Sequence, residues 1–231
     1  MITVTYPNIQ SLAEYVSEND FFVVGELHGI EQNASILKDL LEASALLNDR
    51  VTVAFEWFLT DTELLSLRSF IDGSIKQIKT PSFFQDSDGR VTVSHIALLQ
   101  HIRVMNQKRP GSITLYTFAT ANESSELAMA EALMSIRREV EGPILIETGA
   151  VHAEKRPISL PETMSQLLSS KQSVFSTFLR YEVGTVNVEG ELYDVRDAAT
   201  QQNDISGAFD AIIHVPAAEP AIELPSLTIS G

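Results

Sequence analysis

The order of apolar and amphipathic segments most constrains what this chain can fold into. Short apolar runs, such as residues 21–24 and 51–55, are each followed by a longer segment with apolar residues at helical spacing. A short continuous apolar run is typical of a strand buried on both faces of a sheet. Strands that alternate with helices indicate βαβ crossovers and a largely parallel sheet.

The same alternation continues along most of the chain. Thr60 and Glu63 have the spacing of a capping box, which predicts that a helix begins there. The predicted strands are 21–24, 51–55, 113–118, 143–146, 173–180, 183–188, 191–194 and 211–215, and the predicted helices are 9–17, 31–47, 60–71, 93–107 and about 120–140.

These elements predict one α/β domain over residues 1–231, a layered fold with a mixed, mostly parallel sheet covered by helices. Some strands of the C-terminal third are expected to be antiparallel. The core is expected over about 21–217, and prolines space out a tail over 218–231 that cannot form one regular element.

Charge and composition exclude several classes of function. The net charge of −15 repels phosphate backbones and anionic membranes, so we expect neither a nucleic-acid nor a membrane partner. The chain has no cysteine, which excludes thiol nucleophiles and cysteine-ligated metals. The N-terminal residues lack the pattern of a signal peptide, and the apolar runs are too short to span a membrane. We therefore expect a cytoplasmic protein, with an oligomeric state that the sequence does not predict.

Carboxylates and imidazoles follow three of the predicted strands. Glu26 and His28 follow the first, Glu56 follows the second, and Glu147 and His152 follow the strand at 143–146. The carboxyl ends of parallel strands lie on one edge of a sheet, and ligands bind in the crevice outside that edge. We therefore expect these side chains to converge there.

Two imidazoles and two or three carboxylates have two natural uses. They can hold a divalent metal such as zinc, manganese, cobalt or iron. Alternatively, a carboxylate can orient a histidine that acts as a general base on water. Both uses activate water, which predicts hydrolysis of an ester, lactone or amide in a small-molecule or peptide substrate. The expected catalytic residues, and the ligands of any metal, are Glu26, His28, Glu56 and His152.

A second group of residues is expected to support the site or the fold. Glu147 is expected to orient His152, and His214 lies inside an apolar run that is typical of a core position. His95 and His101 lie on a predicted helix and are expected to be surface or packing residues. The supporting positions considered are Glu147, Glu31, Arg103 and His214, with Arg103 expected to form a salt bridge.

The first motif carries a resemblance to known families. The run Val24-Gly25-Glu26-Leu27-His28-Gly29, followed by Glu31, resembles the opening motif of the erythromycin esterase family. It is also similar to the Gly-Glu-x-His start of ChaN-like haem-binding proteins, whose spacing it matches more closely. Gly149-Ala150-Val151-His152 resembles the Gly-x-x-His motif of the related TraB/Tiki proteins. The resemblance covers residues from about 21 to 217.

The resemblance implies an α/β fold and an edge site with Glu26, His28, Glu56 and His152. Members of this superfamily hydrolyse macrolide lactones, cleave proteins with a metal or bind haem, so membership does not fix the reaction. The alternative to a hydrolase is therefore a haem- or metal-binding protein without catalysis, with haem as its cofactor. A third reading is a member whose pocket is empty.

Overall fold

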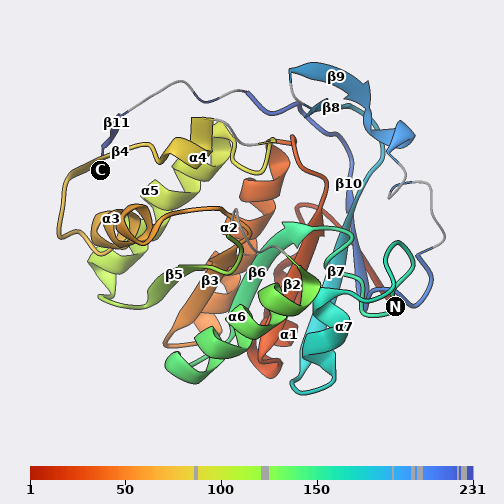
Figure 1. Ribbon diagram of the computed structural model, residues 1–231, viewed down its shortest axis with the longest axis horizontal. Coiled ribbons are helices and arrows are strands. Elements are labelled where there is room, and N and C mark those ends of the chain that lie inside the picture. Colours follow the sequence, from red (N-terminus) through yellow and green to blue (C-terminus); the bar gives the residue numbers. More distant parts are fainter. Residues whose placement is uncertain are drawn as a thin grey trace.

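The computed structural model describes residues 1–85, 88–120, 125–188, 190–198, 201, 205–222, 224 and 228–230. A seven-stranded sheet in the order β1-β10-β7-β2-β6-β3-β5 forms its centre (Figure 1). The strands of this sheet are β1 (Ile2–Thr5), β2 (Phe21–Glu26), β3 (Val51–Phe55), β5 (Ile113–Thr117), β6 (Ile144–Gly149), β7 (Val174–Tyr181) and β10 (Ala211–Val215). All neighbouring strands in it run parallel.

Four further strands form two separate antiparallel pairs. β8 (Thr185–Val188) pairs with β9 (Glu191–Asp194), and β4 (Gln77–Lys79) pairs with β11 (Thr228–Ser230). The predicted fold class is thus confirmed, although the antiparallel strands lie outside the central sheet. Within the C-terminal third, β7 and β10 join the parallel sheet.

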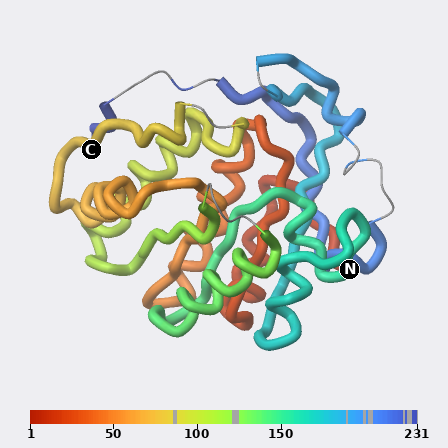
Figure 2. Tube along the Cα trace, in the orientation of Figure 1, coloured from red at the N-terminus to blue at the C-terminus, as the bar shows by residue number. Residues whose placement is uncertain are grey.

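Helices cover both faces of the sheet (Figure 2). On one face, apolar side chains of η1 (Gln10–Leu12), α1 (Ala13–Glu18), α2 (Gln32–Leu47), α3 (Asp61–Ile71) and α5 (Val93–Lys108) form one core cluster with the strands. On the other face, α6 (Glu126–Glu139) and α7 (Met164–Ser169) form a second cluster. Phe22 and Val24 face the first cluster, whereas Phe21 and Val23 face the second. Burial on both faces explains why β2 appears in the sequence as a continuous apolar run.

The predicted capping box at the start of α3 is confirmed. The side chain of Thr60 accepts from the backbone of Glu63, whose carboxylate accepts from the backbone of Thr60. The predicted helix start near residue 120 borders residues 121–124, which lie outside the described residues; α6 begins after Ser125, whose side chain caps it. The short strands β1, β4 and β11 and the helix α4 (Ser82–Gln85) were not predicted, because elements of three or four residues carry little periodic signal.

The register of the central strands brings three strand ends to one level. Glu26 of β2 is paired with Gly149 of β6, and Phe55 of β3 is paired with Glu147 of β6. The backbone N–H of Glu56 donates to the carbonyl of Glu147 at 3.3 Å. In the described part of the chain, no helix has the length and apolarity that a membrane crossing requires.

Candidate functional site

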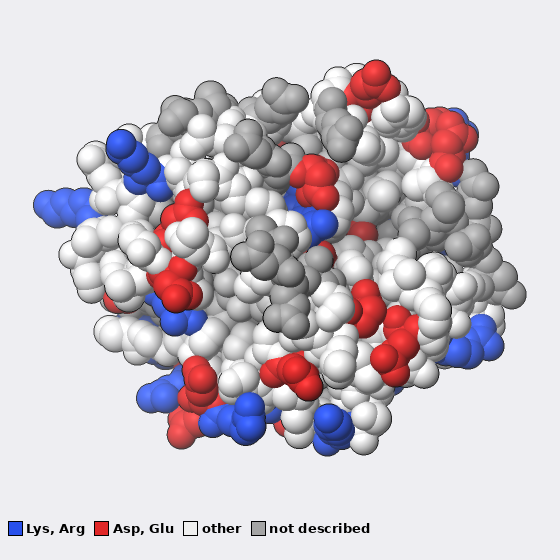
Figure 3. All heavy atoms as spheres, in the orientation of Figure 1, with Lys and Arg blue, Asp and Glu red and all other residues white. Residues whose placement is uncertain are grey.

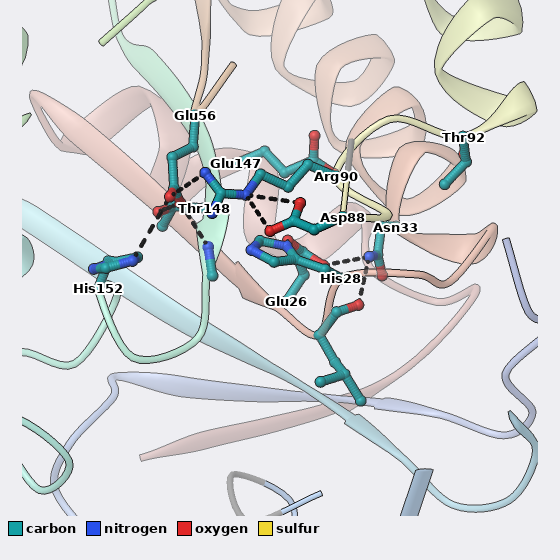
Figure 4. A network of polar contacts seen from close by, with 12 residues as sticks. Glu26, His28, Asn33, Glu56, Asp88, Arg90, Thr92, Glu147, Thr148 and His152 are labelled. Atoms are coloured by element: carbon teal, nitrogen blue, oxygen red, sulfur yellow. Dashed lines mark hydrogen bonds and ion pairs between the residues drawn. The ribbon is translucent and has the colours of Figure 1, made fainter. Parts of the chain in front are cut away.

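The candidate site lies at the carboxyl ends of β2, β3 and β6 (Figure 4). The structure brings together all four residues expected to be catalytic, together with Glu147 from the group expected to support them. In Figure 3, acidic and basic side chains surround a hollow in the face turned to the viewer. The set of residues at this edge is Glu26, His28, Glu56, Asp88, Arg90, His95, Glu126, Glu147 and His152.

Glu26 and His28 form the first carboxylate–imidazole pair. Oε1 of Glu26 contacts Nδ1 of His28, and Oε2 accepts from Nδ2 of Asn33 at 2.5 Å. Burial lowers the pKa of His28, but Glu26, Glu56 and Asp88 outweigh it and raise that pKa to about 9. His28 is therefore cationic at neutral pH. Because Nδ1 contacts Glu26, Nε2 is the ring atom that can donate a proton to a ligand.

The loop that carries His28 depends on Gly29. Gly29 has a φ of +85°, a conformation that favours glycine. A Cβ atom at this position would lie 2.0 Å from the carbonyl oxygen of Asn187. The N–H of Gly29 donates to the carbonyl of Gly89 at 3.0 Å, which ties the His28 loop to the segment that carries Arg90. The glycine in the motif thus allows two loops to cross at the rim of the site.

Glu56 occupies the centre of the cluster. Its Oε2 accepts from Oγ1 of Thr148 at 2.6 Å and from the N–H of Gly149 at 3.1 Å. Its Oε1 lies 2.9 Å from Nη1 of Arg90 and 3.6 Å from Nε2 of His152. Burial raises the pKa of Glu56, but His152, His28 and Arg90 together hold that pKa below its usual value. Glu56 is therefore an anion fixed among donors.

His152 is oriented by Glu126 of α6. Nδ1 of His152 lies 2.5 Å from Oε1 of Glu126, whose other oxygen accepts from the N–H of Met164 at 2.5 Å. Burial lowers the pKa of His152, but Glu126 and Glu56 outweigh this effect and raise it. The sequence predicted Glu147 as the partner of His152, and this was wrong. Glu126 comes from a helix distant in sequence, and no motif marks it.

The two imidazoles lie on either side of Gly149. A Cβ atom at this position would be 3.4 Å from Nε2 of His28 and 3.5 Å from Cδ2 of His152. Any side chain here would thus contact both rings, and glycine leaves the space between them open.

Glu147 is paired with His95, a residue that the sequence placed at the surface or in packing. Oε2 of Glu147 lies 2.9 Å from Nε2 of His95, and both side chains are buried. The backbone N–H of Thr92 donates to Nδ1 of His95 at 3.0 Å, so the ring proton is on Nε2 and points to Glu147. The Thr92-x-x-His95 spacing of a capping box was the available signal, with histidine in place of the usual glutamate or glutamine.

A small cavity lies between these groups. Its volume is about 10 Å³, close to the roughly 10–15 Å³ that one water molecule needs. Oε1 of Glu147 is buried and has no hydrogen-bond donor among the described residues. The cavity is lined by Glu26, His28, Glu56, Trp57, Arg90, Glu147 and Thr148.

Three other residues considered from the sequence have partners outside this cluster. Nη1 of Arg103 donates to the carbonyls of Phe70 and Ile75, so Arg103 fastens the end of α3 in place of the expected salt bridge. Nδ1 of His214 lies 3.8 Å from Glu182 and its side chain is partly exposed, which differs from the expected core position. The carboxylate of Glu31 accepts from the N–H groups of Ser94 and Ile222, both at 2.9 Å. Arg90, which the sequence did not mark, lies between α4 and α5.

The arrangement does not suit a metal ion. Within the described ranges, no three His, Asp or Glu side chains are placed to hold one. The carboxylate oxygens of Glu26 and Glu56 face the protein donors Asn33, Thr148 and Arg90 instead of a common point. Nor does the cavity enclose a haem, because it is the size of one water molecule.

Comparisons with known proteins add a likeness in fold. No family model and no curated protein sequence matches this chain. A solved structure described as "Cofacial heme binding to ChaN of Campylobacter jejuni" is similar to it, with 12% sequence identity and a TM-score of 0.46, covering 75% of this chain and 86% of that chain. The resemblances to erythromycin esterases and TraB/Tiki proteins stay predictions.

Proposed function

We propose that this site activates one water molecule to hydrolyse an ester, lactone or amide bond. The observation that carries the proposal is a water-sized cavity lined by His28 and by Glu147, whose Oε1 atom has no donor in the part of the chain that the structure describes. A buried carboxylate oxygen needs a donor, and a water molecule in this cavity supplies one. The same water is then next to an acceptor for its proton.

In this mechanism Glu147 is the general base. His95 holds Oε2, so Oε1 takes a proton from the water as the water oxygen bonds to the carbonyl carbon. Negative charge develops on the carbonyl oxygen, where the His28 cation and the imidazole of His152 stabilise it.

His28 then acts as the general acid. Its Nε2 proton passes to the leaving oxygen or nitrogen as the bond to the carbonyl carbon breaks. Solvent carries the proton from Glu147 back to His28 and completes the cycle. The sequence suggested a histidine as the general base. Here His28 is the general acid instead, because it is protonated at neutral pH.

The test is hydrolysis of p-nitrophenyl acetate, δ-valerolactone and a chromogenic peptide amide. Glu147→Gln and His28→Ala are each expected to lower kcat by about 10²–10⁴-fold. His101→Ala is the matched control, because His101 pairs with Glu42 of α2 at 2.8 Å and does not line the cavity. Equal rates for wild type and Glu147→Gln on every probe contradict the proposal.

Haem binding is the second candidate, favoured by the orientation of the two histidines. Nδ1 of His28 and of His152 each contact a carboxylate, which is how iron-ligating histidines are held with Nε2 free. A Soret shift on adding hemin, lost in His28→Ala or His152→Ala but kept in His101→Ala, supports this candidate, and no shift in the wild type excludes it.

The proposal retains the remaining expectations from the sequence. These are one α/β domain over residues 1–231, a small-molecule or peptide substrate and a cytoplasmic location.

A further inference from the structure

Two buried residues lie behind Glu26 and continue its hydrogen-bond chain into the core. Asn33 lies in the first turn of α2, and Tyr181 is the last residue of β7. The hydroxyl of Tyr181 contacts Oδ1 of Asn33, and Nδ2 of Asn33 donates to Oε2 of Glu26 at 2.5 Å. The side chain of Asn33 is 2% exposed and that of Tyr181 is 3% exposed. The chain of contacts therefore runs from the buried hydroxyl of Tyr181 to the partly exposed ring of His28.

The direction of every hydrogen bond in this chain is fixed by chemistry. Nδ2 of Asn33 faces two acceptors, Oε2 of Glu26 and the carbonyl of Leu27 at 2.9 Å. A flipped amide would set its oxygen against both of them, so Oδ1 must face Tyr181. Tyr181 is then the donor and stays neutral. Burial and the charges of Glu26 and Glu147 raise the pKa of Tyr181, which is consistent with a neutral hydroxyl.

The fixed direction bears on the state of Glu26. Burial raises the pKa of Glu26 above its usual value, and the contact with His28 acts in the opposite direction. The hydrogen bond from Asn33 favours the charged form, and the charged form accepts from Nδ1 of His28 through Oε1. A protonated Glu26 would instead donate to Nδ1 and move the ring proton to Nε2.

We infer that Tyr181 and Asn33 form a positioning relay that keeps Glu26 an acceptor. The relay thereby holds the Nδ1 proton of His28 in place when Nε2, which is directed at the substrate, gives up its own proton. Neither residue touches the cavity, so both act through Glu26. The titratable and charged groups around the ring are Glu26, Glu56, Asp88, Arg90, Glu147 and His152. The part of this inference that concerns catalysis rests on the proposed hydrolase function.

The test reads the tautomer of His28 directly, in the whole protein without substrate. ¹⁵N–¹H NMR of the imidazoles, recorded above the titration of His28, is expected to show a neutral ring with its proton on Nδ1. Tyr181→Phe keeps the aromatic ring and removes the donor, so the Nε2–H tautomer is expected to increase. Tyr193→Phe is the control, because the hydroxyl of Tyr193 contacts Glu191 on the exposed β8–β9 hairpin.

Kinetics on p-nitrophenyl acetate give a second readout. Tyr181→Phe is expected to lower kcat by about 10-fold with KM unchanged, as for a residue that orients a reacting group. A wild-type ring protonated on Nε2 overturns the relay even if no variant folds. An unchanged tautomer in a folded Tyr181→Phe protein also overturns it. A tautomer change in a protein that hydrolyses none of the probes supports the relay and contradicts the hydrolase.

Discussion

Nε2 of His95 lies 2.9 Å from Oε2 of Glu147, and both side chains are buried beneath the edge of the sheet. The pair joins the first turn of α5 to the strand at the centre of the site, β6. Because the backbone of Thr92 fixes the His95 tautomer, His95 donates to Glu147 and leaves Oε1 for the cavity. The carboxylate that His95 holds is thus also the base of the proposed mechanism.

Replacing His95 by Phe is expected to destabilise the protein. The change leaves the Glu147 carboxylate buried without its donor, which typically costs about 1–3 kcal/mol. Urea unfolding followed by circular dichroism measures the loss. His101→Phe, at a partly exposed pair, is expected to change the free energy of unfolding by about 0–1 kcal/mol. Equal losses in both variants contradict a special role for the buried pair.

Gly149→Ala is expected to leave the fold intact and to abolish hydrolysis. The added Cβ meets His28 and His152 at ordinary contact distances of 3.4 and 3.5 Å, and Gly149 has no left-handed conformation to strain. The added Cβ occupies the space between the two imidazole rings that the carbonyl group of a substrate would enter. Thermal unfolding measures the effect on stability, and the rate on p-nitrophenyl acetate measures the effect on hydrolysis.

Gly25→Ala is the contrasting variant. Its Cβ would lie 2.6 Å from Cβ of Ala153, so this change is expected to lower the melting temperature. A Gly149→Ala protein with wild-type turnover shows that the space between the imidazoles is not where substrate binds.

The charge of His28 links stability to alkaline pH. Its pKa is raised from 6.5 to about 9 on folding. A raised pKa gives stability that is complete below the unfolded value and is lost as pH rises through about 9. Between pH 6 and 10 the wild type is expected to lose about 3 kcal/mol more than His28→Gln. Urea unfolding at each pH measures the free energy of unfolding. If this free energy changes with pH in the same way for both proteins, the raised pKa of His28 is contradicted.

Arg90 is expected to protect the protein against acid. The pKa of Glu56 is held low in the folded state, so its contribution is present above the unfolded value and is lost as pH falls. Arg90→Met removes one of the cations responsible, and the midpoint of acid unfolding is expected to move to higher pH. Near-UV circular dichroism follows the transition through the buried ring of Trp57.

Arg50→Met is the matched control for that experiment. Arg50 lies 3.2 Å from Glu141, but both side chains are exposed and water screens the pair. Its acid midpoint is expected to match that of the wild type. A shift of the same size in both variants shows that the effect arises from net charge.

The local pattern of the sequence was enough to predict most of the elements. Strands β2 and β3 were visible as apolar runs because both faces of the sheet are covered. Their parallel direction followed from the helices between them, and this alone placed Glu26 and Glu56 at one edge. The capping box at Thr60 was equally readable, because all its atoms lie within four residues.

Partners distant in sequence were not readable in the same way. Glu126 reaches His152 from α6, His95 reaches Glu147 from α5, and Tyr181 reaches Asn33 from the far end of β7. No spacing rule marks such pairs, since each depends on how a helix or strand packs against the sheet.

The sequence by itself determined the fold class and the edge at which reactive side chains gather, because periodicity and strand direction are properties of short segments. Only the tertiary structure decided which carboxylate holds which imidazole, and so which groups are charged. Those choices depend on burial and on distances of about 3 Å between elements far apart in the chain, and both exist only after the core has packed.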